Sequence, residues 1–279
     1  MKMKRSEKLG MFTGLVVGVL LLLISVFMIF QTTCKVWGAE KPANATQQGI
    51  DVSSHQGKID WEQVKNSALA DYAIIRCGYG VNQTDKDDKY WDYNSSECER
   101  LGIPYGTYLY SGADTTAKAK SEAEHVVRLL QGKNLTYPIY YDMEADMLNQ
   151  LSSTQIGNIA KTFLNTMESY GYKNVAVYSN KYLFETKLTA SVFSDYPKWI
   201  AQHSNKCTYQ GSYHMWQYST QGVIPGISEK VDLNYKIGNW TYAGYSSAKK
   251  TVVVKPKATT IKSLRKSGKK AVKITYKKV

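Results

Sequence analysis

The stretch GIDVSSHQGKIDWEQVKNSALADYAIIRCGYG, residues 49–80, holds two strand-like runs separated by a helical one. The runs 49–54 and 72–80 contain the β-branched and aromatic residues that favour strands. Between them, Asp60 and Gln63 match an N-cap residue and its capping-box partner at the start of a helix. A strand, a helix and a second strand in this order predict a parallel βαβ unit.

The same alternation continues along the chain. Further strand-like runs are PYGTYLYSG (104–112), PIYYDME (138–144), NVAVYSN (174–180), KWIAQHS (198–204), HMWQYST (214–220) and KVDLNY (230–235). Helical segments fall between the first six of these eight strands. Five βα units followed by strands with little between them predict an α/β fold whose parallel sheet closes as a barrel. A full (β/α)8 barrel needs roughly 250 residues, so we expect this shorter one to lack its last helices.

The charge of the chain is concentrated at its two ends. The formal net charge is +13, from 36 Lys and Arg against 23 Asp and Glu. Residues 1–41 carry six basic and two acidic residues, and residues 246–279 carry twelve basic and no acidic ones. The remaining 18 basic and 21 acidic residues make the body slightly acidic. A nucleic-acid-binding domain would carry its Lys and Arg on the folded body, so we expect no nucleic acid as a partner.

The amino-terminal end, residues 1–41, is predicted to target a membrane. Residues 11–30 (MFTGLVVGVLLLLISVFMIF) contain no charge and follow a basic flank. Their length matches a spanning helix better than a signal-peptide core of about 7–15 residues. The small residues Gly38 and Ala39 leave cleavage open as an alternative. In both cases the positive-inside rule sends the body out of the cytoplasm, so we expect an extracytoplasmic protein, either membrane-anchored or secreted.

The carboxyl-terminal segment, residues 246–279, differs in composition from the body. Alternation at Val272, Ile274 and Tyr276 predicts two strands joined by the turn at residues 267–268. The segment resembles the opening of a fibronectin type III-like module, which needs about 100 residues and is therefore expected to be incomplete here. A disordered basic tail is the alternative. Either form offers a surface for anionic wall polymers.

Cysteines and histidines give no sign of a metal or cofactor. Cys77, Cys98 and Cys207 lie in the body, where one disulfide with a spare thiol and three buried free thiols are both open. No Cys or His pair has metal-ligand spacing. His125 falls in a helical run and is expected to be structural. We therefore expect neither a metal nor a cofactor.

Acidic residues at the ends of predicted strands are the strongest functional signal. Asp142 and Glu144 stand two apart in YYDME, so both side chains leave the same face of the strand. Asp51 ends the first strand and Asp232 lies in the last, and closing the barrel brings these two strands side by side. Four acids in one pocket cannot all ionise cheaply, so we expect at least one raised pKa. A protonated carboxyl beside an ionised one is what cleavage of a glycosidic bond needs.

Aromatic residues accompany these acids in the predicted strands, and their flat faces suit stacking on sugar rings. We expect four of them to line a substrate groove: Tyr79, Tyr110, Tyr178 and Trp199. His55 follows Asp51 by four residues, in the loop above the barrel. It is predicted to contact the substrate.

Six motifs together resemble family 25 of the glycoside hydrolases, the bacterial and phage N-acetylmuramidases. They are GIDVSSHQGKIDW (49–61), YAIIRCGYG (72–80), YYDME (140–144), WIAQHS (199–204), MWQYS (215–219) and VDLN (231–234). The resemblance implies a catalytic domain over residues 47–242 with a TIM-like (β/α)5β3 barrel. It also implies cleavage of the β-1,4 bond between N-acetylmuramic acid and N-acetylglucosamine in peptidoglycan.

The same resemblance assigns roles to individual residues. Glu144 is the implied proton donor, and Asp142 stabilises the positive charge that develops beside it. Asp51 and Asp232 complete the acidic pocket, and Gln217 in MWQYS is an implied substrate contact. One departure is His203, where relatives more often carry an aromatic residue such as Tyr.

The mechanism and two other functions stay open from sequence. Alternate residues on a strand are about 6.5–7 Å apart, between the carboxyl separations of retaining and inverting enzymes. A substrate-assisted route, in which the substrate's acetamide attacks and Asp142 orients it, is favoured because Asp142 neighbours the acid. The barrel could instead bind wall carbohydrate without turnover, or the basic tail could bind anionic polymers in a salt-dependent way.

Overall fold

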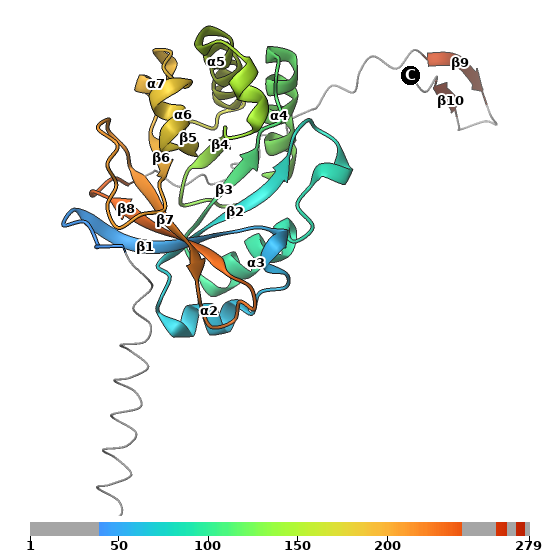
Figure 1. Ribbon diagram of the computed structural model, residues 1–279. Coiled ribbons are helices and arrows are strands. Elements are labelled where there is room, and N and C mark those ends of the chain that lie inside the picture. The colour runs from blue at the N-terminus through green and yellow to red at the C-terminus, as the bar shows by residue number, and fades with distance from the viewer. Residues whose placement is uncertain (1–38, 242–260, 267–271, 277–279) are drawn as a thin grey trace, which may run out of the picture. The chain divides into compact units, whose positions relative to one another are not determined.

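The computed structural model describes residues 39–241 and the two short strands 261–266 and 272–276. Within residues 39–241, eight strands close into a barrel in the order in which they occur along the chain (Figure 1). The strands are β1 (Ala45–Val52), β2 (Tyr72–Tyr79), β3 (Tyr105–Tyr110), β4 (Ile139–Asp142), β5 (Val175–Asn180), β6 (Lys198–Ala201), β7 (Met215–Gly222) and β8 (Val231–Ile237).

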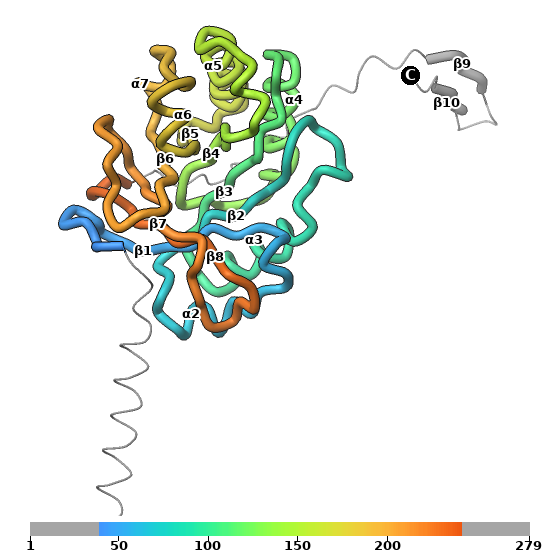
Figure 2. Tube along the Cα trace, in the orientation of Figure 1, coloured from blue at the N-terminus to red at the C-terminus, as the bar shows by residue number. Residues whose placement is uncertain are grey.

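Helices connect only the first six strands of this barrel. The α-helices are α2 (Trp61–Ser67), α3 (Trp91–Leu101), α4 (Thr116–Leu129), α5 (Ser153–Ser169), α6 (Lys181–Thr186) and α7 (Val192–Asp195). The 3-10 helices are η1 (Ser54–Gln56), η2 (Thr84–Lys86) and η3 (Asp146–Gln150). Five βα units followed by β6, β7 and β8 confirm the predicted organisation, and the helices lie on the outer side of the barrel (Figure 2).

The sheet is parallel except at its closing strand. Each strand from β1 to β6 runs parallel to the next. The last strand, β8, is antiparallel to both β7 and β1. Because β7 follows β6 in the parallel sense without a helix between them, the loop at residues 202–214 carries the chain back along the barrel.

Local sequence signals explain how the helices begin. Asp60 caps α2, and its carboxylate accepts a hydrogen bond from the Gln63 backbone N–H at 3.1 Å. The predicted cap is therefore confirmed. The Gln63 side chain differs from the prediction, because it donates to the Asp60 carboxylate at 2.8 Å instead of returning to the cap's backbone. A complete capping box is found at α5, between Ser152 and Gln155.

The barrel separates two apolar cores. One lies between the strands and the helices, where Tyr141 stacks on Phe163 with ring centroids 3.8 Å apart. The other fills the barrel interior. Its members include Tyr72, Ile74, Tyr140, Ala176, Trp199 and Met215. Every second residue of a strand thus faces the barrel interior. For this reason, every second side chain of each motif points toward the same interior space.

The ends of the chain are described only in part. The strands β9 (Ile261–Lys266) and β10 (Val272–Tyr276) pair antiparallel and form a unit of their own, as the predicted hairpin requires. Two strands do not identify a fibronectin type III-like module, and the turn at residues 267–268 lies outside the described residues. So does the predicted membrane segment, residues 11–30. No helix among the described residues is long and apolar enough to cross a membrane.

The three body cysteines carry free thiols. Cys77 and Cys98 are buried, and Cys207 is half-buried. Of the two alternatives left open by the sequence, the structure supports free thiols over a disulfide with a spare.

Candidate active site

Strand pairing brings the acids of distant motifs together at the mouth of the barrel. Asp51 and Asp232 lie directly opposite each other where β1 and β8 pair. Asp142 is the last residue of β4. The predicted meeting of the first and last strands is therefore confirmed. The mouth is formed by the carboxyl ends of the parallel strands, which is where barrels of this class carry their chemistry.

Glu144 lies just beyond the strand on which it was predicted. The strand β4 ends at Asp142, two residues earlier than expected. The chain nevertheless stays tied to β5, because the Met143 N–H donates to the Tyr178 carbonyl at 2.9 Å. Met143 is buried in the outer core, so the alternation continues past the strand end. Glu144 is half-buried and raises the pKa of Asp142 by charge repulsion, in addition to the larger effect of burial.

The pKa is raised at all four acids, in agreement with the expectation that at least one of them would have a raised pKa. Burial raises the pKa of Asp51 well above its ordinary value, and repulsion from Asp232 adds to it. Burial followed by repulsion from Asp51 raises the pKa of Glu144. Burial also raises the pKa of Asp232 to about 6, although a hydrogen bond with Asp51 opposes the rise. The pocket therefore retains protons at a pH where exposed carboxyls have lost theirs.

The Gln217 amide connects the acids to the rest of the pocket. Its Nε2 donates to Asp51 Oδ2 at 3.0 Å and to Asp232 Oδ2 at 3.3 Å. Its Oε1 accepts from the Tyr178 hydroxyl at 3.0 Å and lies 3.0 Å from His203 Nε2. Gln217 is 3% exposed. Gln217 was predicted to contact the substrate. Its buried position between the acids fits a different role, that of orienting the two carboxyls.

A second amide holds Asp51 from below. Asn234 Nδ2 donates to Asp51 Oδ2 at 2.8 Å, and Trp199 Nε1 donates to Asn234 Oδ1 at 2.8 Å. Sequence reasoning missed Asn234, although it stands two residues after Asp232 and therefore shares its face of β8.

Two of the predicted groove aromatics lie inside the barrel. Trp199 is 1% exposed and packs on Tyr178 and Tyr140, with ring centroids 4.4 and 4.9 Å away. Tyr178 is 7% exposed. The position of Trp199 contradicts a role as a sugar-stacking surface, because an inward side chain one layer below the mouth is covered by its neighbours. Tyr178 is connected to the acids through its hydroxyl, which donates to Gln217 Oε1.

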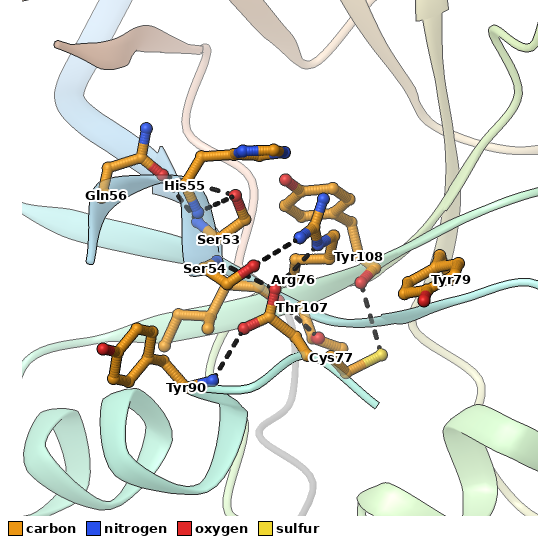
Figure 3. Close-up of polar contacts among 12 residues, drawn as sticks. Ser53, Ser54, His55, Gln56, Arg76, Cys77, Tyr79, Tyr90, Thr107 and Tyr108 are labelled. Carbon is orange, nitrogen blue, oxygen red and sulfur yellow. Dashed lines mark hydrogen bonds and ion pairs between the residues drawn. The ribbon is translucent and has the colours of Figure 1, made fainter. Parts of the chain in front are cut away.

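The other predicted contacts lie where a substrate can reach them. Tyr79 ends β2 and is 41% exposed, and its register partner Tyr110 ends β3 and is 36% exposed. Lys86 Nζ lies 5.0 Å from the centre of the Tyr79 ring. His55 is exposed in η1, after β1. Figure 3 shows His55 and Tyr79 in the surroundings of Arg76.

Arg76 is a charged residue near the acids that sequence reasoning missed. Its Nε pairs with Asp88 Oδ2 at 2.8 Å, and its Nη2 donates to Ser54 Oγ at 2.9 Å (Figure 3). The positive charge lowers the pKa of Asp142, against the larger opposing effects of burial and of the other acids. A charged residue in the middle of the apolar run YAIIRCGYG was the available signal, because a strand interior rarely holds an unpaired charge.

Glu122 was also missed, and it supports the pocket from outside the barrel. This buried residue of α4 accepts hydrogen bonds from Tyr141 Oη at 2.6 Å, Ser111 Oγ at 2.9 Å and the Gly112 N–H at 2.7 Å. The Ser111 N–H in turn donates to the Asp142 carbonyl at 2.9 Å. Glu122 thus ties together the ends of β3 and β4. Its helix contains many charged residues, and their spacing does not indicate which one is buried.

His125 has the structural role that was expected of it. It is fully buried in α4, with Nε2 2.7 Å from Asp87 and Nδ1 3.0 Å from the Gly80 carbonyl. Among the described residues, no group of three or more His, Cys, Asp or Glu side chains is arranged to hold a metal ion.

Comparison with known proteins identifies the family of this barrel. Residues 50–227 match the model of glycosyl hydrolases family 25. The chain belongs to this family. It is accordingly a glycoside hydrolase, as the motifs indicated.

Individual relatives agree with this assignment. The autolytic lysozyme of Clostridium acetobutylicum is 30% identical over 188 residues, which are 67% of this chain and 55% of that protein. The modular autolysin LytC of Streptococcus pneumoniae is 33% identical, with a TM-score of 0.62 over 68% of this chain and 46% of LytC. A family 25 glycosyl hydrolase from Bacillus anthracis, 21% identical, shares the fold with a TM-score of 0.63 over 72% of this chain and 94% of its own. The chain thus spans about half of the clostridial and pneumococcal proteins.

Proposed function

We propose that this glycoside hydrolase is an N-acetylmuramidase, which cleaves the β-1,4 bond between N-acetylmuramic acid and N-acetylglucosamine in peptidoglycan. The observation that carries the proposal is the cluster of four acids with raised pKa values at the mouth of a family 25 barrel. Such a cluster keeps a protonated carboxyl beside ionised ones, which is the requirement for protonating a leaving sugar.

Glu144 is the proposed proton donor. It is half-buried, whereas Asp142 and Asp51 are only 2% and 5% exposed. A donor must reach the glycosidic oxygen of a bound glycan, and Glu144 is better placed for this than the two buried acids. Burial raises its pKa, so it keeps its proton at a higher pH than an exposed glutamate.

Asp142 is the proposed assisting carboxylate. Its Oδ1 is buried and has no hydrogen-bond partner among the described residues. A buried carboxyl oxygen without a partner is costly, and functional sites are where such costs are retained. We infer that Asp142 opposes the positive charge developing on the sugar or orients the acetamide of the substrate in a substrate-assisted reaction.

Asp51 and Asp232 share the Gln217 amide and supply negative charge beside the donor. Repulsion from Asp51 contributes to the raised pKa of Glu144. We propose that Asp51 helps to keep Glu144 protonated at the start of the reaction.

The proposed partner is the glycan strand of peptidoglycan, with Tyr79, Tyr110 and His55 as contacts at the mouth. The LytC relative has been determined in complex with a synthetic peptidoglycan ligand, which supports peptidoglycan as the class of partner. The relatives are named as an autolytic lysozyme and an autolysin, which supports the proposal of an extracytoplasmic location. Membrane attachment through residues 11–30 and binding of anionic polymers by residues 246–279 remain proposals from the sequence.

The test compares wild-type protein with Glu144→Gln on purified cell walls. Wild type is expected to clear the suspension and release reducing sugars, and Glu144→Gln is expected to pellet with the walls without clearing them. Glu124→Gln, on a half-exposed position of α4, controls for the loss of one carboxylate. If wild type pellets with walls but releases nothing, the barrel is a binding module, and clearing by Glu144→Gln would refute the donor assignment.

A further inference from the structure

The turn η1, which carries His55 after β1, is held by hydrogen bonds within itself. Ser53 caps the turn, and its Oγ accepts from the His55 N–H at 3.2 Å. The Gln56 side chain returns to the Ser53 N–H, which donates to Gln56 Oε1 at 2.9 Å. Among the described residues, the His55 imidazole has no hydrogen-bond partner of its own. The position of this exposed ring therefore depends on the backbone of η1.

A buried carboxylate anchors this turn to the second strand. Asp88 Oδ2 accepts from the Ser54 N–H at 2.9 Å and from Arg76 Nε at 2.8 Å. Arg76 Nη2 also donates to Ser54 Oγ at 2.9 Å (Figure 3). Ser54 is therefore bound through both its backbone and its side chain. It directly precedes His55 in the chain, so the anchor acts on the residue next to the imidazole.

Asp88 is itself fixed on its other side. Its Oδ1 accepts from the Tyr90 N–H at 2.9 Å, and its own N–H donates to the Cys77 carbonyl at 2.8 Å. The Asp88 carboxyl is fully buried, and the Arg76 side chain is 16% exposed. Removing two charges from water is costly, and an apolar pair of similar volume is often equally stable. The cost fits an ion pair that sets the position of a turn better than one that only adds stability.

A further contact connects η1 with the closing strand of the barrel. Gln56 Nε2 donates to the Lys230 carbonyl at 3.0 Å, one residue before β8 begins. The strands β8 and β1 carry Asp232 and Asp51, which lie opposite each other. The turn that carries His55 is therefore tied to the same strand ends as two of the acids.

We propose that Asp88 is a positioning residue for glycan binding, which acts through Ser54 and Arg76 to hold His55 within reach of the bound strand. The inference rests on the proposed function, because it takes His55 as a contact of the peptidoglycan glycan. Asp88 is buried and does not touch the substrate. It fixes the place of a ring that has no other anchor among the described residues.

The experiment is a double-mutant cycle on KM for soluble glycan fragments of peptidoglycan. Asp88→Asn cannot accept hydrogen bonds on both sides, because an amide has a single oxygen. We expect it to raise KM by roughly 10-fold, about the loss of one hydrogen bond to the glycan, and to leave kcat within about 3-fold of wild type. His55→Ala should raise KM by a similar factor. In the double variant the two factors should not multiply, because both changes remove the same contact.

Two further variants make the cycle specific. Asp87→Asn is the matched control, because Asp87 is the neighbouring carboxylate and pairs with Arg128 and His125 of α4. It should lower the urea midpoint of unfolding and leave KM at its wild-type value. Ser54→Ala removes only the acceptor of Arg76 Nη2. It should raise KM by a smaller factor, which disappears in the His55→Ala background, and it takes the place of Asp88→Asn if that variant does not fold.

The outcomes separate this inference from the function on which it rests. A purely structural Asp88 would lower the unfolding midpoint and leave KM unchanged, and that result would overturn the inference. It is also overturned if His55→Ala leaves KM unchanged, or if the factors for Asp88→Asn and His55→Ala multiply. Glu144→Gln is assayed in parallel, and activity in that variant refutes the donor assignment alone. If wild type releases no sugars, the proposed function fails, and the same cycle measured as Kd for pelleting with walls still tests the link between Asp88 and His55.

Discussion

Two layers of the barrel interior differ sharply although the same strands build both. The lower layer, near the amino ends of the strands, is apolar and aromatic, and Tyr72 stacks on Tyr137 there with ring centroids 4.4 Å apart. The upper layer holds Asp51, Asp142 and Gln217, and the carboxyls in it have raised pKa values. The lower layer contributes stability through burial, whereas the upper layer loses stability by burying like charges. The comparison indicates that the lower layer stabilises the fold, whereas the upper layer holds the residues proposed for the reaction.

The largest expected effect is on activity, from a change in the upper layer. Asp142→Asn removes the assisting carboxylate, and we expect kcat on purified walls to fall by roughly 100- to 1,000-fold. Met215→Leu, a volume-conserving change one layer lower, is the matched control and should stay within about 3-fold of wild type. Equal losses in both variants would show that the two layers are not functionally distinct.

The next effect is on stability, from a change in the lower layer. A Cβ added at Gly106 would lie 2.5 Å from the Pro138 carbonyl oxygen and 2.7 Å from Tyr137 Cβ. We expect Gly106→Ala to lower the free energy of unfolding by about 2 to 3 kcal/mol, measured by urea denaturation. Gly112→Ala is the control, because its nearest contact would be Glu122 Oε1 at an ordinary 3.9 Å. If both variants are equally stable, the lower layer is less tightly packed than described.

A smaller effect of opposite sign is expected in the upper layer. The pKa of Asp232 is about 6 in the folded protein against an ordinary 3.8. The folded state therefore binds more protons than the unfolded one in this window, and stability falls as pH rises from about 4 through 6. Asp232→Asn should flatten this dependence and raise the free energy of unfolding at pH 7 by roughly 1 to 2 kcal/mol. Asp146→Asn, at an exposed position in η3, controls for the loss of one charge.

That prediction has a clear opposite result. If Asp232→Asn is less stable than wild type at pH 7, the hydrogen bonds to Asp232 outweigh the repulsion that it suffers, and the upper layer does not oppose folding.

The smallest expected effect is that of a chelator. The described acids of the upper layer are arranged around amides and one another, and the proposed reaction uses protons only. EDTA should leave the rate of wall clearing unchanged. Loss of activity that zinc restores would revive a metal-dependent reaction.

The barrel could be predicted from the sequence because strand-like runs alternate with helical segments in every βα unit. Eight strands were placed within a few residues, and the acids at their ends were found because strand ends converge when a barrel closes. The end of β4 was placed two residues late, since YYDME continues its alternation beyond the last strand residue, Asp142.

The depth at which an inward-facing side chain lies in the barrel was harder to predict than the face of the strand from which it projects. Trp199 faces inward as its motif indicates, but alternation does not say whether a residue lies at the mouth or one layer below. Burial on the helical side was equally hidden, because Glu122 stands among charged residues that are exposed. Asn234 on β8 and Gln217 on β7 both donate hydrogen bonds to Asp51 on β1. These contacts join strands that are far apart in the sequence, and the alternation along one strand does not predict them.

The most direct test of the central claim is mass spectrometry of the glycan fragments released from purified peptidoglycan. The account predicts N-acetylmuramic acid at every new reducing end with wild type, and no new ends with Glu144→Gln. N-acetylglucosamine at the new reducing ends would contradict it, because the enzyme would then cleave the other glycosidic bond of the wall.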